Sequence, residues 1–114
     1  MPGIERALSV RQPYAEQILR GEKTEEFRSR QTHVRERVYL YAGLKPGDRD
    51  SWEELGKVPG QLPAGVIVGT VEIAGCEWDD DLDCYVWQLE SPRRVRQRLR
   101  PKNQPQPGIW RPKF

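Results

Sequence analysis

The segment that most restricts the fold is residues 65–74 (GVIVGTVEIA), a run of β-branched residues interrupted once by glycine. β-Branched residues favour strands, and a glycine in mid-strand is typical of a bend or of a close approach by another backbone. Alternation places every second residue on the side that we expect to face the core, namely Ile67, Gly69, Val71 and Ile73. A strand that bends in this way is typical of a small β-barrel.

The other apolar segments are short and are separated by Gly, Pro and polar residues. Between Pro92 and Pro101 the few apolar positions favour an exposed edge strand over a helix. The expected strands occupy residues 7–10, 23–30 (with Phe27 directed inward), 37–42, 65–74, 85–90 and 92–100. Residues 108–110 are the last segment with apolar side chains to bury.

Two segments have helical character. Residues 13–20 carry an apolar stripe, and Gly21 stands where a helix ends. Residues 50–56 are expected to form one helical turn after a cap at Asp50 or Ser51. About six strands with one or two brief helices predict a mainly β (α+β) fold, a closed or partly closed small barrel. The length suits a single domain over residues 1–114.

The basic residues are concentrated near the C-terminus. The chain has a net charge of +2, but the basic, Pro-rich segment 91–114 holds eight Lys and Arg and no acid, which leaves −6 on residues 1–90. An acidic segment, residues 77–83, lies within that negative part and is expected to form a loop. Such a dipole presents a defined face to a polyanion. We therefore expect RNA or another nucleic acid as the partner, with a nucleotide-like small molecule as a further candidate.

The sequence shows no membrane or export signal. No apolar stretch approaches the roughly 20 residues that span a bilayer, and the N-terminal residues lack an apolar h-region, so we expect a cytoplasmic protein without a membrane partner. Cys76 and Cys84 are expected to be reduced thiols, although a hairpin that joined them would allow a disulfide in an oxidising buffer. With His33 the single histidine, we expect no metal site and no cofactor.

A cluster of charged residues follows the predicted first helix, at Gly21, Lys23, Glu26 and Arg28 (G-x-K-x-x-E-x-R). On a strand, Glu26 and Arg28 point the same way, and Lys23 reaches them from the turn after Gly21. The two cations attract a phosphate or a carboxylate, and the carboxylate between them orients both and can accept a hydrogen bond from a base or ribose. The alternative is an ion-pair network that only fixes the first turn of the barrel.

Further candidate ligand-binding residues surround the turn between the first strand and the first helix. Arg11 and Gln12 lie where free helix amides favour an anion, and solvated loop residues are the alternative. Tyr14 and Trp110 are candidates for stacking on a base, although core packing suits Trp110 better. His33 is expected to be a plain surface or loop residue.

The arginine-rich segment is a second candidate for nucleic-acid contacts. Alternate arginines on a strand share one face at steps of about 6.6 Å, close to the phosphate spacing of an extended nucleic acid strand. A charged edge strand that prevents aggregation is the alternative. The candidate residues are Arg94, Arg96, Arg98, Arg100 and Lys102.

Taken together, these motifs resemble the ASCH family. Its opening LS-x-x-QP-[aromatic]-A is matched by Leu8, Ser9, Gln12, Pro13, Tyr14 and Ala15, and its hallmark G-x-K-x-x-E-x-R by Gly21, Lys23, Glu26 and Arg28. The strand at 65–73 and the closing residues 108–110 also fit, whereas the loop at 45–62 is unmatched. The likeness is strongest to small bacterial members and to the C-terminal ASCH domain of the thyroid-receptor-interacting transcription coactivator. It implies a PUA-like β-barrel with a cleft beside the first helix.

The resemblance also bears on function. Family members are thought to bind RNA or other nucleic acids, a ribonuclease role has been proposed for some, and one branch resembles hydrolases of an N-acylated cytidine. In that branch a Lys precedes a nucleophilic Thr by three residues, and a late strand supplies a Glu. Here Lys23 matches, but Glu26 and Gln88 stand at the other two places, which argues against that chemistry.

We therefore expect a nucleic-acid-binding module with a basic cleft around the motif. The alternative is a small hydrolase, a ribonuclease or an amidohydrolase, that uses Lys23 and Glu26. A protein-interaction adaptor that uses the acidic segment 77–83 is a third reading.

Overall fold

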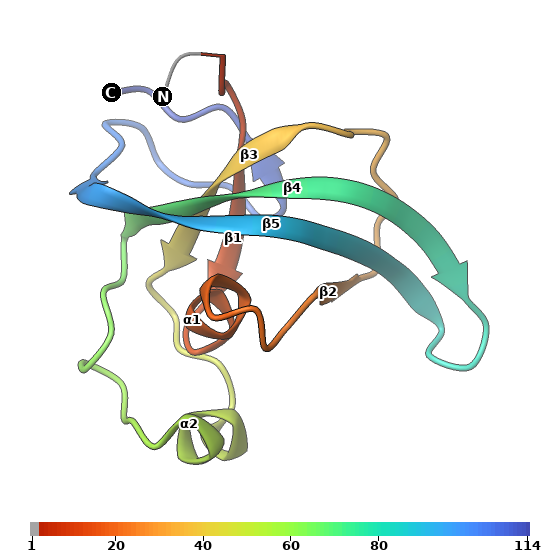
Figure 1. The fold of residues 1–114 in the computed structure, drawn as a ribbon, viewed down its shortest axis with the longest axis horizontal. Coiled ribbons are helices and arrows are strands. Elements are labelled where there is room, and N and C mark those ends of the chain that lie inside the picture. The colour runs from red at the N-terminus through yellow and green to blue at the C-terminus, as the bar shows by residue number, and fades with distance from the viewer. Residues whose placement is uncertain (1–2) are drawn as a thin grey trace.

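The computed structural model describes residues 3–114, and most of the regular structure is β (Figure 1). Two short helices interrupt the order of the strands in the chain. The elements are β1 (Ala7–Arg11), α1 (Tyr14–Leu19), β2 (Glu25–Arg28), β3 (Arg37–Gly43), α2 (Arg49–Leu55), β4 (Val66–Asp79), β5 (Cys84–Leu99) and β6 (Ile109–Trp110). Within the described residues neither helix is long and apolar enough to cross a membrane.

All six strands belong to one sheet, in the order β2-β5-β4-β3-β1-β6. The neighbours β1 and β3 are parallel, and the other neighbours are antiparallel. The sheet curls into a half-barrel, with α1 in its mouth and α2 on the long connection between β3 and β4 (Figure 1). The prediction of a mainly β, barrel-like fold with two short helices is confirmed.

The long strands β4 and β5 bend because their register shifts three times. Gly69 allows one of these shifts: a Cβ there would lie 2.3 Å from the carbonyl oxygen of Arg93 and 2.5 Å from Leu19. The shifts also overturn the prediction of one inward face on β4. Val68 packs with Val71 and Ile73, whereas Ile67 packs on the opposite side of the sheet, because a bulge reverses the alternation.

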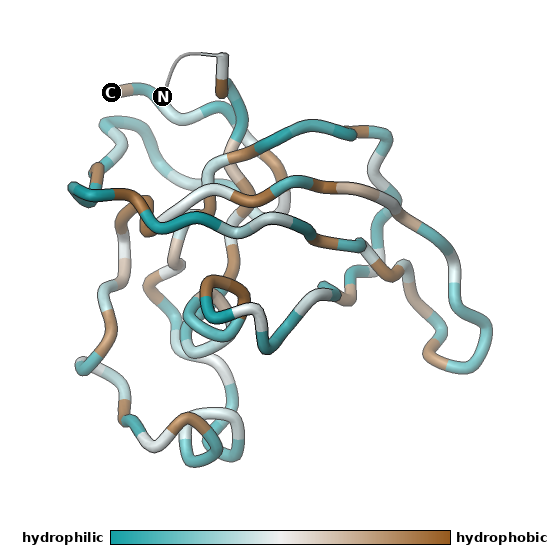
Figure 2. The backbone as a smooth tube through the Cα atoms, viewed as in Figure 1, coloured by the Kyte–Doolittle hydropathy of each residue, from teal (hydrophilic) through white to brown (hydrophobic). Residues whose placement is uncertain are grey.

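Two groups of buried side chains cover the two faces of the sheet. The larger group lies under α1 and includes Leu8, Ile18 and Trp87; the smaller includes Tyr41 and Trp110, which meet edge to face at 5.3 Å. Figure 2 shows the brown, apolar positions along the middle of the strands and the teal, polar positions on the connections and the hairpin end. The burial of Trp110 confirms the prediction that residues 108–110 close the core.

Several local predictions are confirmed and three are corrected. Gly21 ends the first helix in the left-handed region, at φ 76°. The second helix is capped by Asp48 rather than by Asp50 or Ser51, because the Asp48 carboxylate accepts a hydrogen bond from the Ser51 amide at 3.0 Å.

The second correction concerns Phe27, which is 47% exposed although it was expected to face inward. Its neighbours Glu26 and Arg28 take the inner side of β2 because their charges satisfy each other there. The third concerns the acidic segment: β4 continues through Asp79, so only residues 80–83 form the loop. In this hairpin Cys76 lies opposite Trp87 and Cys84 opposite Asp79, and both thiols are free.

Candidate functional site

The motif residues come together at the start of the half-barrel. The carboxylate of Glu26, which is 8% exposed, lies 3.5 Å from the Lys23 ammonium and 2.5 Å from the Arg28 guanidinium. Arg28 donates a further hydrogen bond, of 2.6 Å, to the carbonyl oxygen of Ser9 on β1. Lys23 approaches from the turn after Gly21, as the parity of the positions indicates. The cluster therefore joins the edge strand β2 to β1 without a strand-to-strand ladder between them.

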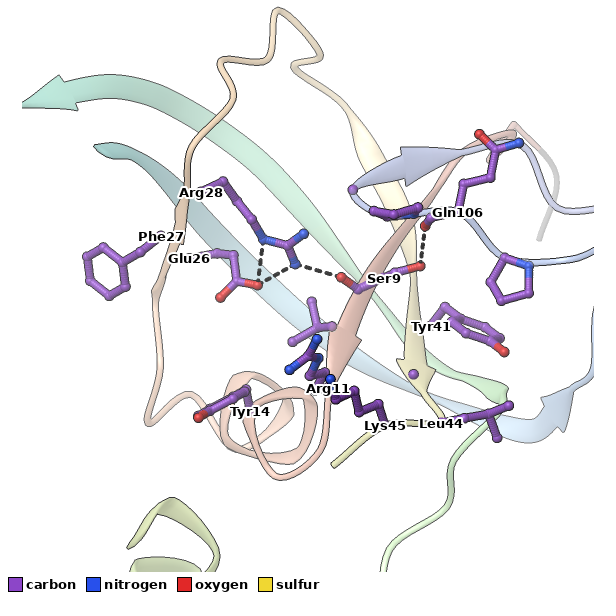
Figure 3. A pocket seen from close by; sticks show the side chains of 15 residues that line it. Ser9, Arg11, Tyr14, Glu26, Phe27, Arg28, Tyr41, Leu44, Lys45 and Gln106 are labelled. Carbon is purple, nitrogen blue, oxygen red and sulfur yellow. Dashed lines mark hydrogen bonds and ion pairs between the residues drawn. The ribbon is translucent and has the colours of Figure 1, made fainter. Parts of the chain in front are cut away.

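Glu26 and Arg28 of this cluster form one wall of a cleft of about 540 Å³ (Figure 3), whereas Lys23 lines a smaller cavity of about 340 Å³. Side chains from β1, α1, β2 and β3 line it, together with the loop after β3 and a C-terminal segment. The lining residues are Ser9, Val10, Arg11, Tyr14, Glu26, Phe27, Arg28, Tyr41, Gly43, Leu44, Lys45, Pro105, Gln106, Pro107 and Gly108. Glu26 and Arg28 lie on one side of β1 and Tyr41 on the other.

Tyr14 lies at the mouth of this cleft, and residues of the loop before α2 contact its ring and its hydroxyl. Its hydroxyl donates to the carboxylate of Asp48, and a Cβ at Gly47 would lie 2.5 Å from its ring. The hydrogen bond from Tyr14, with those from Ser51, lowers the pKa of Asp48 to about 2. On the cleft side the Lys23 ammonium lies 5.7 Å from the ring centroid of Tyr14. The loop before α2 thus fixes the Tyr14 ring next to the motif.

Arg11 and Gln12, neighbours in the sequence, go to different places. Arg11 is exposed and lines the cleft, with no hydrogen bond or ion pair to any residue in 3–114. Gln12 is 3% exposed; its amide oxygen accepts from the Glu16 amide at 3.0 Å, and its amide nitrogen donates to the Pro63 carbonyl at 3.0 Å. Gln12 therefore anchors α1 and lines a second cavity, of about 530 Å³, behind the cleft.

The arginine-rich part of β5 borders that second cavity. Arg94, Arg96 and Arg98 line it, but Arg94 forms two hydrogen bonds, of 2.6 and 2.9 Å, with Glu16, which is 6% exposed. The hydrogen bonds from Arg94 lower the pKa of Glu16, and Arg20 adds to the effect at 2.7 Å. The Arg94 side chain therefore connects α1 to β5 through Glu16, and its charge is already paired.

The remaining basic candidates are distributed along the C-terminal part of the chain. Arg96 and Arg98 are exposed and have no hydrogen bond or ion pair to residues 3–114. Arg100 reaches the far end of the cleft, because a Cβ at Gly65 would lie 3.4 Å from its Nη1 and 2.9 Å from Leu44. Lys102 is exposed, and its backbone amide donates to the Lys113 carbonyl at 2.6 Å.

The part of the cleft that lies opposite the motif was not predicted from the sequence. Tyr41, Leu44 and Lys45 come from β3 and the loop after it, and residues 105–108 form the opposite wall. Ser9 holds that wall: its hydroxyl donates to the Gln106 carbonyl at 2.9 Å and accepts from the Trp110 indole at 2.8 Å. No local pattern marks these residues, because a segment about a hundred residues after β1 pairs with it.

Three other residues lie outside the cleft. Trp110 is 5% exposed and packs in the core, so it offers no stacking face. Gln88 is exposed and lies opposite Glu25 and Gly75 on the outer side of β5. His33 is exposed. Within residues 3–114, no three His, Cys, Asp or Glu side chains gather as metal ligands.

Comparison with known proteins places the chain in a family. A search of curated proteins found no match. The family profile of the ASCH domain matches residues 8–98, which include β1, α1, β2, β3, α2, β4 and most of β5. ASCH domains are generally considered RNA-binding domains of the PUA-like type. On the profile match, supported by the half-barrel and by the grouping of Lys23, Glu26 and Arg28, the chain belongs to the ASCH domain family.

Proposed function

We propose that this protein binds RNA, or a nucleotide-like ligand, in the cleft beside the motif. The observation that carries the proposal is the position of Glu26 and Arg28 on the cleft wall, with Lys23 paired to Glu26 beside it and two further cations, Arg11 and Lys45, on the same cleft. These five side chains carry four positive charges and one negative charge. A phosphate-bearing ligand matches that balance.

The internal geometry of the cluster supports a binding role. Glu26 fixes the orientation of Arg28 through Nε and Nη2, and Nη1 keeps no partner in residues 3–114. An oriented guanidinium with unused N–H groups binds a phosphate with little loss of side-chain freedom. Arg11 and Lys45, both exposed, then add charge without a neutralising acid.

A hydrolase that uses Lys23 and Glu26 receives less support from the geometry. Ser9 is the one serine or threonine among the described residues of the cleft, and its hydroxyl is already bonded to Gln106 and Trp110. Glu26 forms ion pairs with Lys23 and Arg28, so its carboxylate is their counter-ion and is not placed to act as a general base on a nucleophile. We therefore propose binding without turnover.

The test is a titration of fluorescently labelled single-stranded RNA. The double variant Arg11→Ala/Lys45→Ala removes two exposed cations and leaves the core untouched. We expect its affinity to fall about tenfold or more at low salt, because each lost phosphate contact weakens binding. A gel of the same samples checks for cleavage of the RNA.

The matched control is Arg49→Ala/Lys57→Ala, which removes the same charges from α2 and the residues after it, outside the cleft. We expect it to bind RNA like the wild type. Equal weakening by both double variants would refute the cleft as the binding site, and RNA cleavage by the wild type would favour the hydrolase.

We also propose that residues 1–114 form a single domain located in the cytoplasm. One continuous sheet, from residue 7 to residue 110, carries both groups of buried side chains, which supports one cooperative unit. A single unfolding transition, coincident by near- and far-UV circular dichroism, is the expected result.

A further inference from the structure

The cleft has a second end that the motif does not occupy. Tyr41 lines it and is 4% exposed, yet its hydroxyl has no hydrogen-bond partner within residues 3–114. The hydroxyl oxygen itself is accessible, because Trp52 Nε1 is the one fully buried side-chain polar atom without a partner among residues 3–114. A hydroxyl that is open to a cleft can donate a hydrogen bond to a group from outside the chain.

The side chains around this hydroxyl are mostly apolar, and the charge of Arg100 also acts on it. Leu44, Pro105 and Pro107 line the same part of the cleft, and Leu44 is 72% exposed. Behind it, the Tyr41 ring is fixed by its edge contact with Trp110. Burial raises the pKa of the Tyr41 hydroxyl, which keeps it a hydrogen-bond donor at neutral pH. A flat, mostly apolar group with an acceptor on its edge fits this end, and a nucleobase has that chemistry.

The two ends of the cleft lie on opposite sides of β1. Arg28, at the motif end, donates to the carbonyl oxygen of Ser9, and Ser9 is the register partner of Tyr41 on the neighbouring strand. The Tyr41 side chain packs with Trp110 on one face of the sheet, whereas Val10 of β1 packs on the other. Figure 3 shows Arg28 and Tyr41 on the two sides of β1, with Arg11 near the end of that strand. A ligand that reaches both ends must therefore pass around β1, and we take two linked nucleotides as the shortest such ligand.

We propose that the cleft binds a dinucleotide step of a single strand. The phosphate and base of one nucleotide lie at the motif end, beside Lys23 and Arg28. The base of the next nucleotide lies at the Tyr41 end, where the hydroxyl of Tyr41 donates to its edge and Leu44 covers its face. This inference rests on the proposed function and adds the size and the class of its ligand.

The experiment compares the four nucleoside 5′-monophosphates with the four matching 5′-phosphorylated homodinucleotides, by calorimetry or NMR titration. For the wild type we expect at least one dinucleotide to bind about fivefold or more tightly than its mononucleotide, as one stacked base contributes. Tyr41→Phe should lower this ratio about three- to tenfold, the effect of one hydrogen bond.

Two further variants separate a ligand contact from a folding defect. Leu44→Ser removes the apolar wall at an exposed position and should also lower the ratio. Tyr39→Phe makes the same chemical change on the same strand, at a residue that does not line the cleft, and should leave the ratio unchanged.

The outcomes also separate this inference from the function on which it rests. Equal affinities for mono- and dinucleotides, or a ratio that neither Tyr41→Phe nor Leu44→Ser changes, would overturn the second site while nucleotide binding stands. If wild-type protein binds neither these ligands nor longer RNA, the proposed function fails as well.

Discussion

At the scale of single residues, Glu16 is a buried carboxylate that joins the first helix to β5. It lies on α1, is 6% exposed, and holds Arg94 with two hydrogen bonds and Arg20 with one. A carboxylate removed from water in this way is stable only while its cations remain in place. Because Arg94 belongs to β5, this ion pair attaches the helix beside the cleft to the longest strand.

We therefore predict that Glu16→Gln lowers the free energy of unfolding by about 1.5–3 kcal/mol at pH 7, the range for hydrogen bonds to charged groups. The half-exposed Arg94 favours the lower part of that range. Urea unfolding of both proteins, followed by tryptophan fluorescence, measures the difference.

The same pair predicts a pH dependence. Arg94 lowers the pKa of Glu16 in the folded protein from its usual 4.5, so the stabilisation is complete above pH 4.5 and is lost as pH falls through the lowered value. The stability difference between wild type and Glu16→Gln should therefore shrink steadily below pH 4.5. A difference that stays constant down to pH 2 would contradict the role of the ion pair.

At the scale of elements, the clamp between β1 and the C-terminal segment shapes the cleft. Ser9 bonds Gln106 and Trp110 through its side chain, and its amide donates to the Gly108 carbonyl at 3.0 Å. Residues 105–108 have no regular structure of their own. Their position therefore depends on β6 and on this one serine.

Ser9→Ala is predicted to loosen that wall. The variant leaves the Trp110 indole N–H, in a 5% exposed residue, without its acceptor, at a cost of about 1–3 kcal/mol. Hydrogen exchange should accelerate in residues 104–110 and remain unchanged in the hairpin of β4 and β5. Faster exchange throughout the chain would instead indicate global destabilisation.

At the scale of the whole molecule, cations without an ion-pair partner among residues 3–114 line both cavities. Arg11 and Lys45 lie at the cleft, and Arg96 and Arg98 lie at the second cavity. Acidic residues are concentrated at the far hairpin, around residues 79–83. This distribution of charge favours the binding of a nucleic acid strand that enters the cleft and continues over β5.

The salt dependence of binding tests this arrangement. For a 20-nucleotide single-stranded RNA, Arg96→Ala/Arg98→Ala should reduce the slope of log K against log salt by about 1.4, which is two contacts at about 0.7 each. For a dinucleotide the same variant should have no effect, because that ligand ends inside the cleft. An unchanged slope with the long RNA would show that β5 is a charged edge without a ligand.

Much of the fold follows from local patterns. The β-branched run at 65–74, the alternation at 37–42 and the punctuation of α1 by Pro13 and Gly21 each predict an element that the structure contains. The arginine-rich strand was also predicted, from its bracketing prolines. These succeed because strand and helix propensities act over a few residues.

Two errors have separate physical origins. On β4 the alternation was read as uninterrupted, but bulges opposite β5 reverse it between Ile67 and Val71. Phe27 was placed inside on hydrophobicity, yet Glu26 takes the inner position because Lys23 and Arg28 satisfy its charge. On β4 the partner that outweighs the local preference, β5, is distant in sequence, whereas on β2 charges within three residues of Glu26 decide which side chain faces inward.

The sequence by itself determined the family, the mainly β class and the motif of Lys23, Glu26 and Arg28, because each depends on residue type and short spacing. Only the tertiary structure decided what the motif faces. Tyr41 and the wall at 105–108 meet the motif through pairings across β1 that no short window of sequence contains. Fold class is encoded by periods of a few residues, whereas a cleft is made where strands that are far apart in the chain become neighbours.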